Sequence, residues 1–221
     1  MDEFKTEEAG ELPQVSATSP RWTGAPSIAL AHQLNEQCVK LVCEFAATSS
    51  HQELPQFVLQ NRDLWRLLET EACKRVAAFP FVIVDLRFKD AQSWQRAGEG
   101  HLMSPTDSTL YACMPPNLFE DLVLETLLFA RQAAREDISV AKAMFAMTSP
   151  VASLIASLTL QQVRTIAISN TQQQFRVRWD SDPQFWGELL VACRAGDERA
   201  MAAVRRQGKL LFCGELIQIR K

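Results

Sequence analysis

Apolar residues recur every three or four positions along most of the chain, which is the spacing of one face of an α-helix. This spacing predicts helices over residues 27–48 and 61–78, and another long helix that begins at Asn117. Two shorter runs, FVIVDLRF at 81–88 and QFRVRW at 174–179, alternate with a period of two, which is typical of a strand. The pattern therefore predicts a mainly α protein with one short β-strand in each half.

Start and stop signals divide the second half into short helices. Ser149-Pro150 opens one apolar segment, and Thr159 with Gln162 three residues later forms a capping box for the next. Two helices then follow each other with almost no loop, which is helix-turn-helix spacing. Other signals of this kind are the N-caps Asp90, Asp182 (before Pro183) and Asp197, and the C-terminal stops Gly196 and Gly208. Residues 209–221 fit either a short strand pair or a packed extension.

Both halves follow the same order of elements. Each has a long helix, short apolar segments, a further helix, the strand, an acidic turn and then Trp94 or Trp186. Between them, residues 97–116 are rich in glycine, serine and proline, which favours a linker. The expected organisation is a flexible acidic tail (1–26), an N-terminal unit (27–96), the linker (97–116), a C-terminal unit (117–195) and a basic C-terminal extension (196–221).

Four segments of the second half resemble the FlhD subunit of the bacterial flagellar master regulator: LLFARQAARED, AKAMFAM, LIASLTLQQVRTIA and QQFRVRW. The resemblance implies two FlhD-like helical units in tandem with a helix-turn-helix-like pair. It also implies a DNA-binding transcriptional activator subunit that works with a FlhC-like zinc-binding partner on double-stranded DNA. Related pairs control flagellar-type genes or the transfer genes of integrative and conjugative elements.

Composition narrows the class of protein only a little. The chain is 47% hydrophobic and 22% charged, which is ordinary for a globular protein and excludes global disorder. Charges interrupt every apolar stretch before the roughly 18 residues that a membrane span needs. The acidic N-terminus lacks the basic and apolar regions of a secretory signal, so the cytoplasm is the expected compartment.

Signals for enzyme chemistry are weak. The six cysteines are scattered without a CxxC pair, which favours reduced, buried thiols over a zinc site. The three histidines lack a nucleophile or carboxylate at a motif spacing, and there is no phosphate-binding glycine loop. We therefore expect no catalytic activity, no bound metal and no cofactor.

Candidate DNA contacts come from the distribution of basic residues, since the net charge is only −3. Arg176 and Arg178 lie two apart on the second strand, so both are expected on one exposed face, although a merely solvated face fits equally well. The candidates that would extend this patch are Arg164, Arg205, Arg206 and Lys209. Contacts of this kind would bind phosphates and leave base reading to a partner.

The long helix after residue 116 has an unusually wide apolar stripe, which suggests more than one packing partner. The candidate interface residues are Leu124, Leu127, Leu128 and Phe129. They would join either two subunits of a homo-oligomer or the two units of an intrachain pseudo-dimer, and a wholly internal core is the alternative.

The competing function is a non-DNA-binding adaptor or anti-activator that sequesters a regulatory partner.

Overall fold

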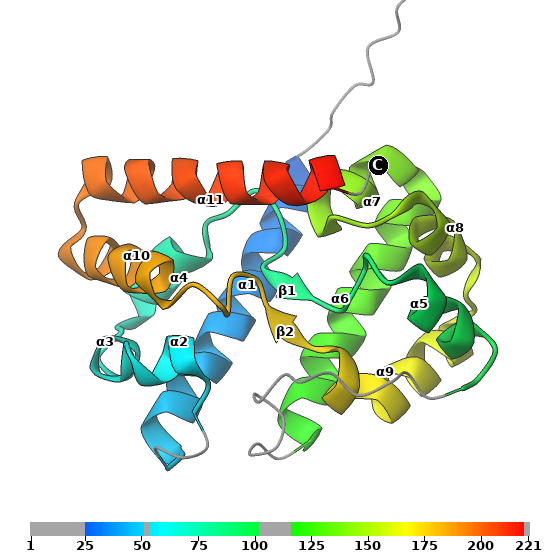
Figure 1. Cartoon of the computed structure of the whole chain (residues 1–221), viewed down its shortest axis with the longest axis horizontal. Helices are drawn as coiled ribbons and strands as arrows, with labels where there is room; N and C mark the ends of the chain where they lie inside the picture. Colours follow the sequence, from blue (N-terminus) through cyan, green and yellow to red (C-terminus); the bar gives the residue numbers. More distant parts are fainter. Residues whose placement is uncertain (1–24, 51–53, 102–115, 219–221) are drawn as a thin grey trace, which may run out of the picture.

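The computed structural model describes residues 25–50, 54–101 and 116–218. The described part is mainly helical, as predicted, with one small antiparallel sheet (Figure 1). In chain order the elements are α1 (Ala25–Thr48), α2 (Gln56–Leu59), α3 (Arg62–Arg66), α4 (Thr70–Ala77), β1 (Val84–Asp85), α5 (Ala91–Gly98), α6 (Pro116–Glu136), α7 (Ile138–Phe145), α8 (Ser149–Ser157), α9 (Leu160–Gln174), β2 (Arg176–Val177), α10 (Pro183–Ala195) and α11 (Glu198–Gln218). Most of the predicted tail (1–26) and linker (97–116) lies outside the described residues. The exceptions are residues 25–26 in α1, residues 97–101 at and just after the end of α5, and Pro116 at the start of α6.

The two strands pair with each other at the centre of the molecule, with Val84 opposite Val177 and Asp85 opposite Arg176. Both are much shorter than predicted. Arg87 and Trp179 each adopt a left-handed backbone with φ of 59°, which turns the chain two residues after each strand. Before β1, the Ile83 amide donates to the side chain of buried Asn35 instead of to a strand.

Helices of the two halves pack against each other on both sides of this sheet. Helix α5, which follows β1, packs against α8 and α9 of the second half, whereas α10, which follows β2, packs against α2, α3 and α4 of the first. In Figure 1 the sheet lies between these two groups of helices. The buried apolar side chains of both halves form one continuous cluster. The predicted units 27–96 and 117–195 therefore share a core instead of each enclosing its own.

Matched landmarks follow the two strands at one constant sequence separation. The left-handed residues Arg87 and Trp179, the N-caps Asp90 and Asp182, and the buried Trp94 and Trp186 form three such pairs. Each aspartate accepts a hydrogen bond of 3.0 Å from the amide three residues later. This repetition supports a duplicated plan, while descent from two FlhD-like units stays a prediction.

The predicted helix boundaries hold wherever a local cap defines them. The Thr159 hydroxyl accepts from the Gln162 amide, and Gln162 accepts from the Thr159 amide, so the capping box opens α9. Asp197 caps α11, and Gly196 ends α10 with φ of 66°. Helix α8 begins at Ser149, as predicted, and its N-cap is Thr148.

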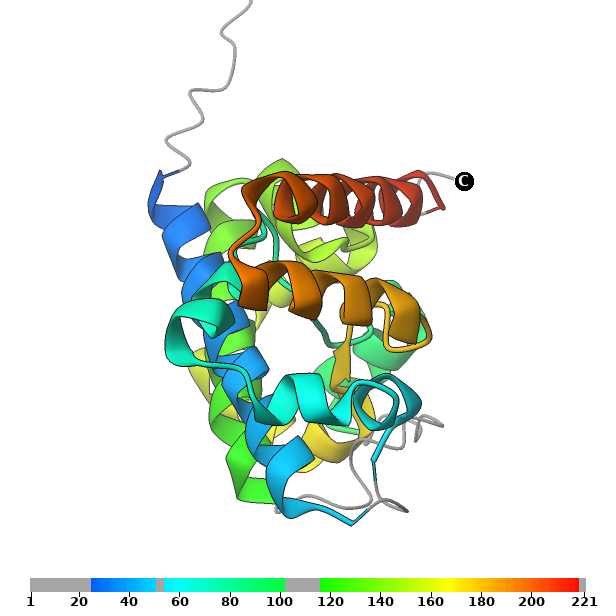
Figure 2. The same ribbon diagram turned by 90° about the vertical axis from the view of Figure 1, so that its left-hand side faces the viewer.

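Gly208 does not end a helix, so that prediction is wrong. Helix α11 continues through it to Gln218 and lies across the molecule above α10 (Figure 2). A methyl group on Gly208 would lie 2.8 Å from a ring carbon of Phe79 and 3.2 Å from one of Phe185. The glycine is there because α11 packs closely on these rings, and the predicted C-terminal extension is an integral part of the core.

We expect Gly208→Ala to destabilise the protein by about 1–3 kcal/mol, because the added methyl overpacks the Phe79 and Phe185 contact. Gly214 is the matched control, since it lies in the same helix and a methyl group added there would have nothing within 4 Å. Gly214→Ala should stabilise by about 0.5–1 kcal/mol through helix propensity. Urea unfolding of both variants measures this, and equal effects would contradict the packing argument.

Candidate interaction surfaces

Arg178 is buried, with 3% of its surface exposed, so its predicted place on an exposed strand face is wrong. Its guanidinium donates to the Val82 carbonyl (2.9 Å), the Phe145 carbonyl (2.6 Å) and the Glu215 carboxylate (2.6 Å), and it lies 5.0 Å from the Phe212 ring centre. The strand ends at Val177, and α11 covers the side that a longer strand would have left open. Arg178 thus joins three distant segments and cannot contact a phosphate.

Arg176 remains half-exposed but has an intramolecular partner. Its guanidinium donates twice to the Asp180 carboxylate, at 2.8 and 3.2 Å. Hydrogen bonding to Asp180 raises the pKa of Arg176. A phosphate would have to compete with this bidentate pair, so the two strand arginines do not form an exposed cationic patch.

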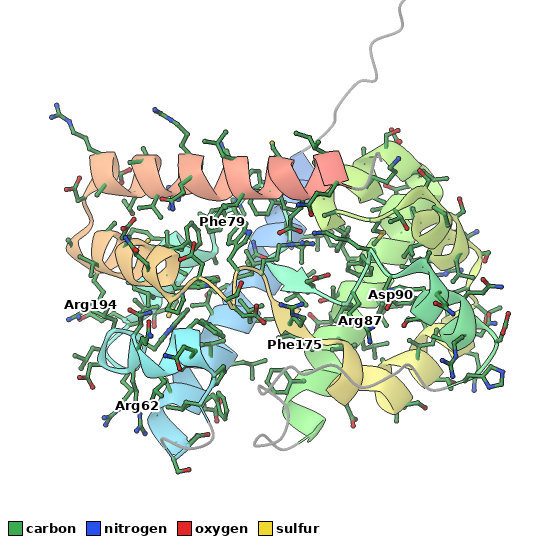
Figure 3. All side chains as sticks on the ribbon, viewed as in Figure 1. Arg62, Phe79, Arg87, Asp90, Phe175 and Arg194 are labelled. Atoms are coloured by element: carbon green, nitrogen blue, oxygen red, sulfur yellow. The ribbon has the colours of Figure 1, made fainter. Side chains whose placement is uncertain are left out.

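Several other arginines donate hydrogen bonds to carbonyl groups at the C-terminal ends of helices. Arg62 donates to the Ala46 and Ser49 carbonyls at the end of α1 (Figure 3), Arg75 donates to the Cys193 carbonyl near the end of α10, and Arg205 donates to the Arg75 carbonyl near the end of α4. The last carbonyls of a helix lack intrahelical donors and carry partial negative charge, so a guanidinium there is stabilising. Arg205, a predicted DNA contact, is therefore engaged in the fold.

His32 lies close to this arginine. Burial, with a further contribution from Arg205, lowers the pKa of His32 below its ordinary value. The unfolded chain then binds a proton at His32 more readily than the folded chain does, so stability should decrease as the pH falls through about 6.5. We expect His32→Gln to flatten the pH dependence of the unfolding midpoint between about pH 7.5 and 5.5. If the slope is unchanged in the variant, groups other than His32 cause the pH dependence of the unfolding midpoint.

The remaining predicted cations are exposed but do not converge. Arg206 and Lys209 lie on α11, whereas Arg164 lies on α9, and Figures 1 and 2 place these helices at opposite edges of the molecule. Arg164 shares the outer face of α9 with Leu160 and Ile168, which are 58% and 66% exposed. The structure therefore does not bring the six predicted DNA contacts together.

The apolar stripe on α6 divides into internal and outer parts. Leu127 is fully buried, so its predicted role in a subunit interface is wrong. Leu124 and Phe129 are partly buried against the core, and Leu128 is 38% exposed. The stripe is wide because α6 packs on α1, α7, α8 and α9 at once. Leu128 and Phe129 line a groove together with residues of α1, and the intrachain pseudo-dimer stays a prediction.

An open groove runs between α1 and α6, and we call it the α1–α6 groove. One part, of about 340 Å³, is mostly apolar and is lined by Leu30, Gln33, Leu34, Glu125, Leu128, Phe129 and Gln132. The other part, of about 260 Å³, is lined by Gln37, Lys40, Leu41, Glu44, Asp121, Leu122 and Glu125. Glu125 borders both parts, so they lie next to each other along the two antiparallel helices.

A larger groove of about 750 Å³ lies between α10 and α11 beside the turn from α2 to α3, and we call it the α10–α11 groove. Its walls are mainly small or apolar, including Leu64, Gly187, Val191, Ala200, Ala203 and Val204. Val191 is 55% exposed. The carboxylates of Glu188 and Asp197 are the charged groups among the residues that line it.

The described cysteines differ in burial and in the pKa of the thiol, and a hydrogen bond with Cys43 lowers the pKa of Cys73. Burial raises the pKa of Cys38 to about 12 and that of Cys193 to about 11, whereas Cys213 is exposed, contrary to the expectation that all are buried. Cys113 lies outside the described residues. In the described ranges no three His, Cys, Asp or Glu side chains are placed to hold a metal ion.

No single described helix has the length and the apolar composition that crossing a membrane requires. Helices α7 and α8 together meet the composition criterion, but the chain bends by 115° between them.

Comparison with known protein families, with curated proteins and with solved structures gives no match to this chain.

Proposed function

We propose that the protein is a regulatory adaptor that binds a helix of a protein partner, and that DNA contact is not its main activity. The α10–α11 groove carries this proposal. It is large, mainly apolar and lined by small side chains, which let the backbone of a docked helix approach closely. Three of the six predicted DNA contacts, Arg176, Arg178 and Arg205, are instead bonded within the fold.

The partner would contribute large apolar side chains to this groove. Its small residues leave room for them, and Val191 and Leu64 provide apolar walls. The FlhD resemblance makes a FlhC-like zinc-binding protein the first partner to test. In that complex the adaptor would either present the partner to its target or sequester it.

A matched pair of substitutions on α11 tests this proposal. Ala203 lines the groove, whereas neighbouring Ala202 is exposed and does not. Ala203→Trp should fill the groove and abolish co-elution with a co-expressed FlhC-like partner, while Ala202→Trp should leave co-elution intact. Loss of binding in both variants, or in neither, would contradict a partner site in this groove.

A DNA-binding activator subunit is the second candidate, because Arg199, Arg206 and Lys209 are exposed along α11 and α9 contains no acidic residue. A gel shift over a salt series, with and without the partner, separates the two functions. An adaptor alone should show at most weak binding, whereas a protein with six to ten phosphate contacts loses about 10³–10⁵ in affinity between about 50 and 200 mM salt. A steep salt dependence that Arg206→Glu with Lys209→Glu reduces would favour the activator.

A further inference from the structure

The α1–α6 groove has two chemically different ends. At one end Leu30 and Leu128 expose 45% and 38% of their surfaces, beside Leu34 and Phe129. At the other end lie the carboxylates of Glu44, Asp121 and Glu125. Among the described residues these three carboxylates form no ion pair, and Lys40 of this stretch is paired with Glu36 at 2.7 Å. The groove is thus apolar at one end and anionic at the other.

The outer face of α11 has the complementary pattern. Its middle part exposes the cations Arg206 and Lys209, and its last part exposes Leu210 (68%), Cys213 and Ile217 (60%). Gly214 lies on the same part of the helix, where an added methyl group would have no atom within 4 Å. This helix forms one edge of the molecule in Figures 1 and 2, so its outer face is accessible to another molecule.

The spacing of the two patterns agrees. Arg206 precedes Cys213 by the same two turns of helix that separate Asp121 from Leu128, about 10 Å at 1.5 Å per residue. If α11 of one molecule lies parallel to α6 of a second molecule, the apolar end of α11 reaches Leu128. The cations of α11 then reach the carboxylates of the groove. Two antiparallel helices with a groove between them are a normal site for a third helix.

We propose that a second copy of this chain docks the outer face of its α11 into the α1–α6 groove. The interface is heterologous, since the helix of one copy meets the groove of the next, so association continues beyond dimers unless a ring closes. This contact is separate from the α10–α11 groove and does not depend on the proposed adaptor function.

Sedimentation velocity of the full chain over a concentration and salt series tests the proposal. The natural protein should gain mass with concentration and lose it at high salt. Asp121→Lys with Glu125→Lys makes the groove cationic, and Arg206→Glu with Lys209→Glu makes the helix anionic. Each double variant alone should be monomeric, with a dissociation constant raised by roughly tenfold or more.

Mixing the two double variants is the decisive step. The cationic groove of one variant then meets the anionic helix of the other, and the remaining groove and helix keep their natural charges. Association should therefore return in the equimolar mixture. The control is Glu99→Lys, which is exposed, lines neither groove and should associate like the natural protein. A natural protein that stays monomeric, or a mixture that does not associate, overturns the proposal, and circular dichroism checks that every variant is folded.

Discussion

Replacing Arg178 with methionine is expected to lower the free energy of unfolding by about 3–5 kcal/mol, the usual cost of removing one partner from a buried ionic network. The change leaves the Val82 and Phe145 carbonyls without their donor and removes the cation from the Phe212 ring. Glu215 keeps Lys89 at 2.8 Å, so its charge is not left wholly unpaired. Urea unfolding at neutral pH measures the loss.

Two further substitutions define what Arg178 contributes. Arg178→Lys retains the charge but loses the planar fork that reaches three acceptors, so it should be destabilising even though the charge is conserved. Arg176→Met is the matched control on the same strand, and its exposed pair with Asp180 should contribute less than about 1 kcal/mol. Similar losses for Arg176→Met and Arg178→Met would mean that Arg178 is not the buried connection that its contacts indicate.

The Arg178 network also explains why the predicted exposed arginine face of β2 is absent. Alternation along QFRVRW correctly identifies β2 but assumes that the strand is long and that one face meets water. The side chain that fills this space is Phe212 of α11, far away in the sequence. Short-range pattern cannot show that a distant helix covers a strand.

Local signals were reliable because the groups that form each cap lie close together in the sequence. Thr159 with Gln162, Asp182 and Asp197 bond to amides within three residues, so the sequence contains everything that the cap requires. Gly208 looked like a stop signal but serves a distant contact with Phe79. Glycine has both uses, and only the packing distinguishes them.

The grooves were not predictable because each depends on residues far apart in the sequence: the α1–α6 groove lies between two distant helices, and the α10–α11 groove is completed by the turn from α2 to α3. The stripe on α6 indicated more than one neighbour, which is correct, yet it did not show that Leu127 faces inward and Leu128 outward. That division follows from the position of α1, whose Leu30 and Leu34 complete the α1–α6 groove.

Trp186→Ala is expected to cost about 3–5 kcal/mol, because it removes a fully buried ring from the contact between α10 and the first half. The Trp186 ring centre lies 5.5 Å from that of Trp65 and 5.9 Å from that of Phe57. Trp94→Ala, at the matched position after β1, should cost a similar amount, since Trp94 is equally buried and stacks on Phe88.

Substitution by phenylalanine should separate the two tryptophans. The Trp94 indole N–H donates to the Leu86 carbonyl at 3.2 Å, whereas the Trp186 N–H has no acceptor among the described residues. Trp94→Phe leaves a buried carbonyl without its donor, but Trp186→Phe removes an unpaired donor, so the first should be more destabilising by about 1–3 kcal/mol. Urea unfolding of both variants under one set of conditions measures the difference. Equal losses would show that both N–H groups are satisfied and that the two halves hold their tryptophans in the same way.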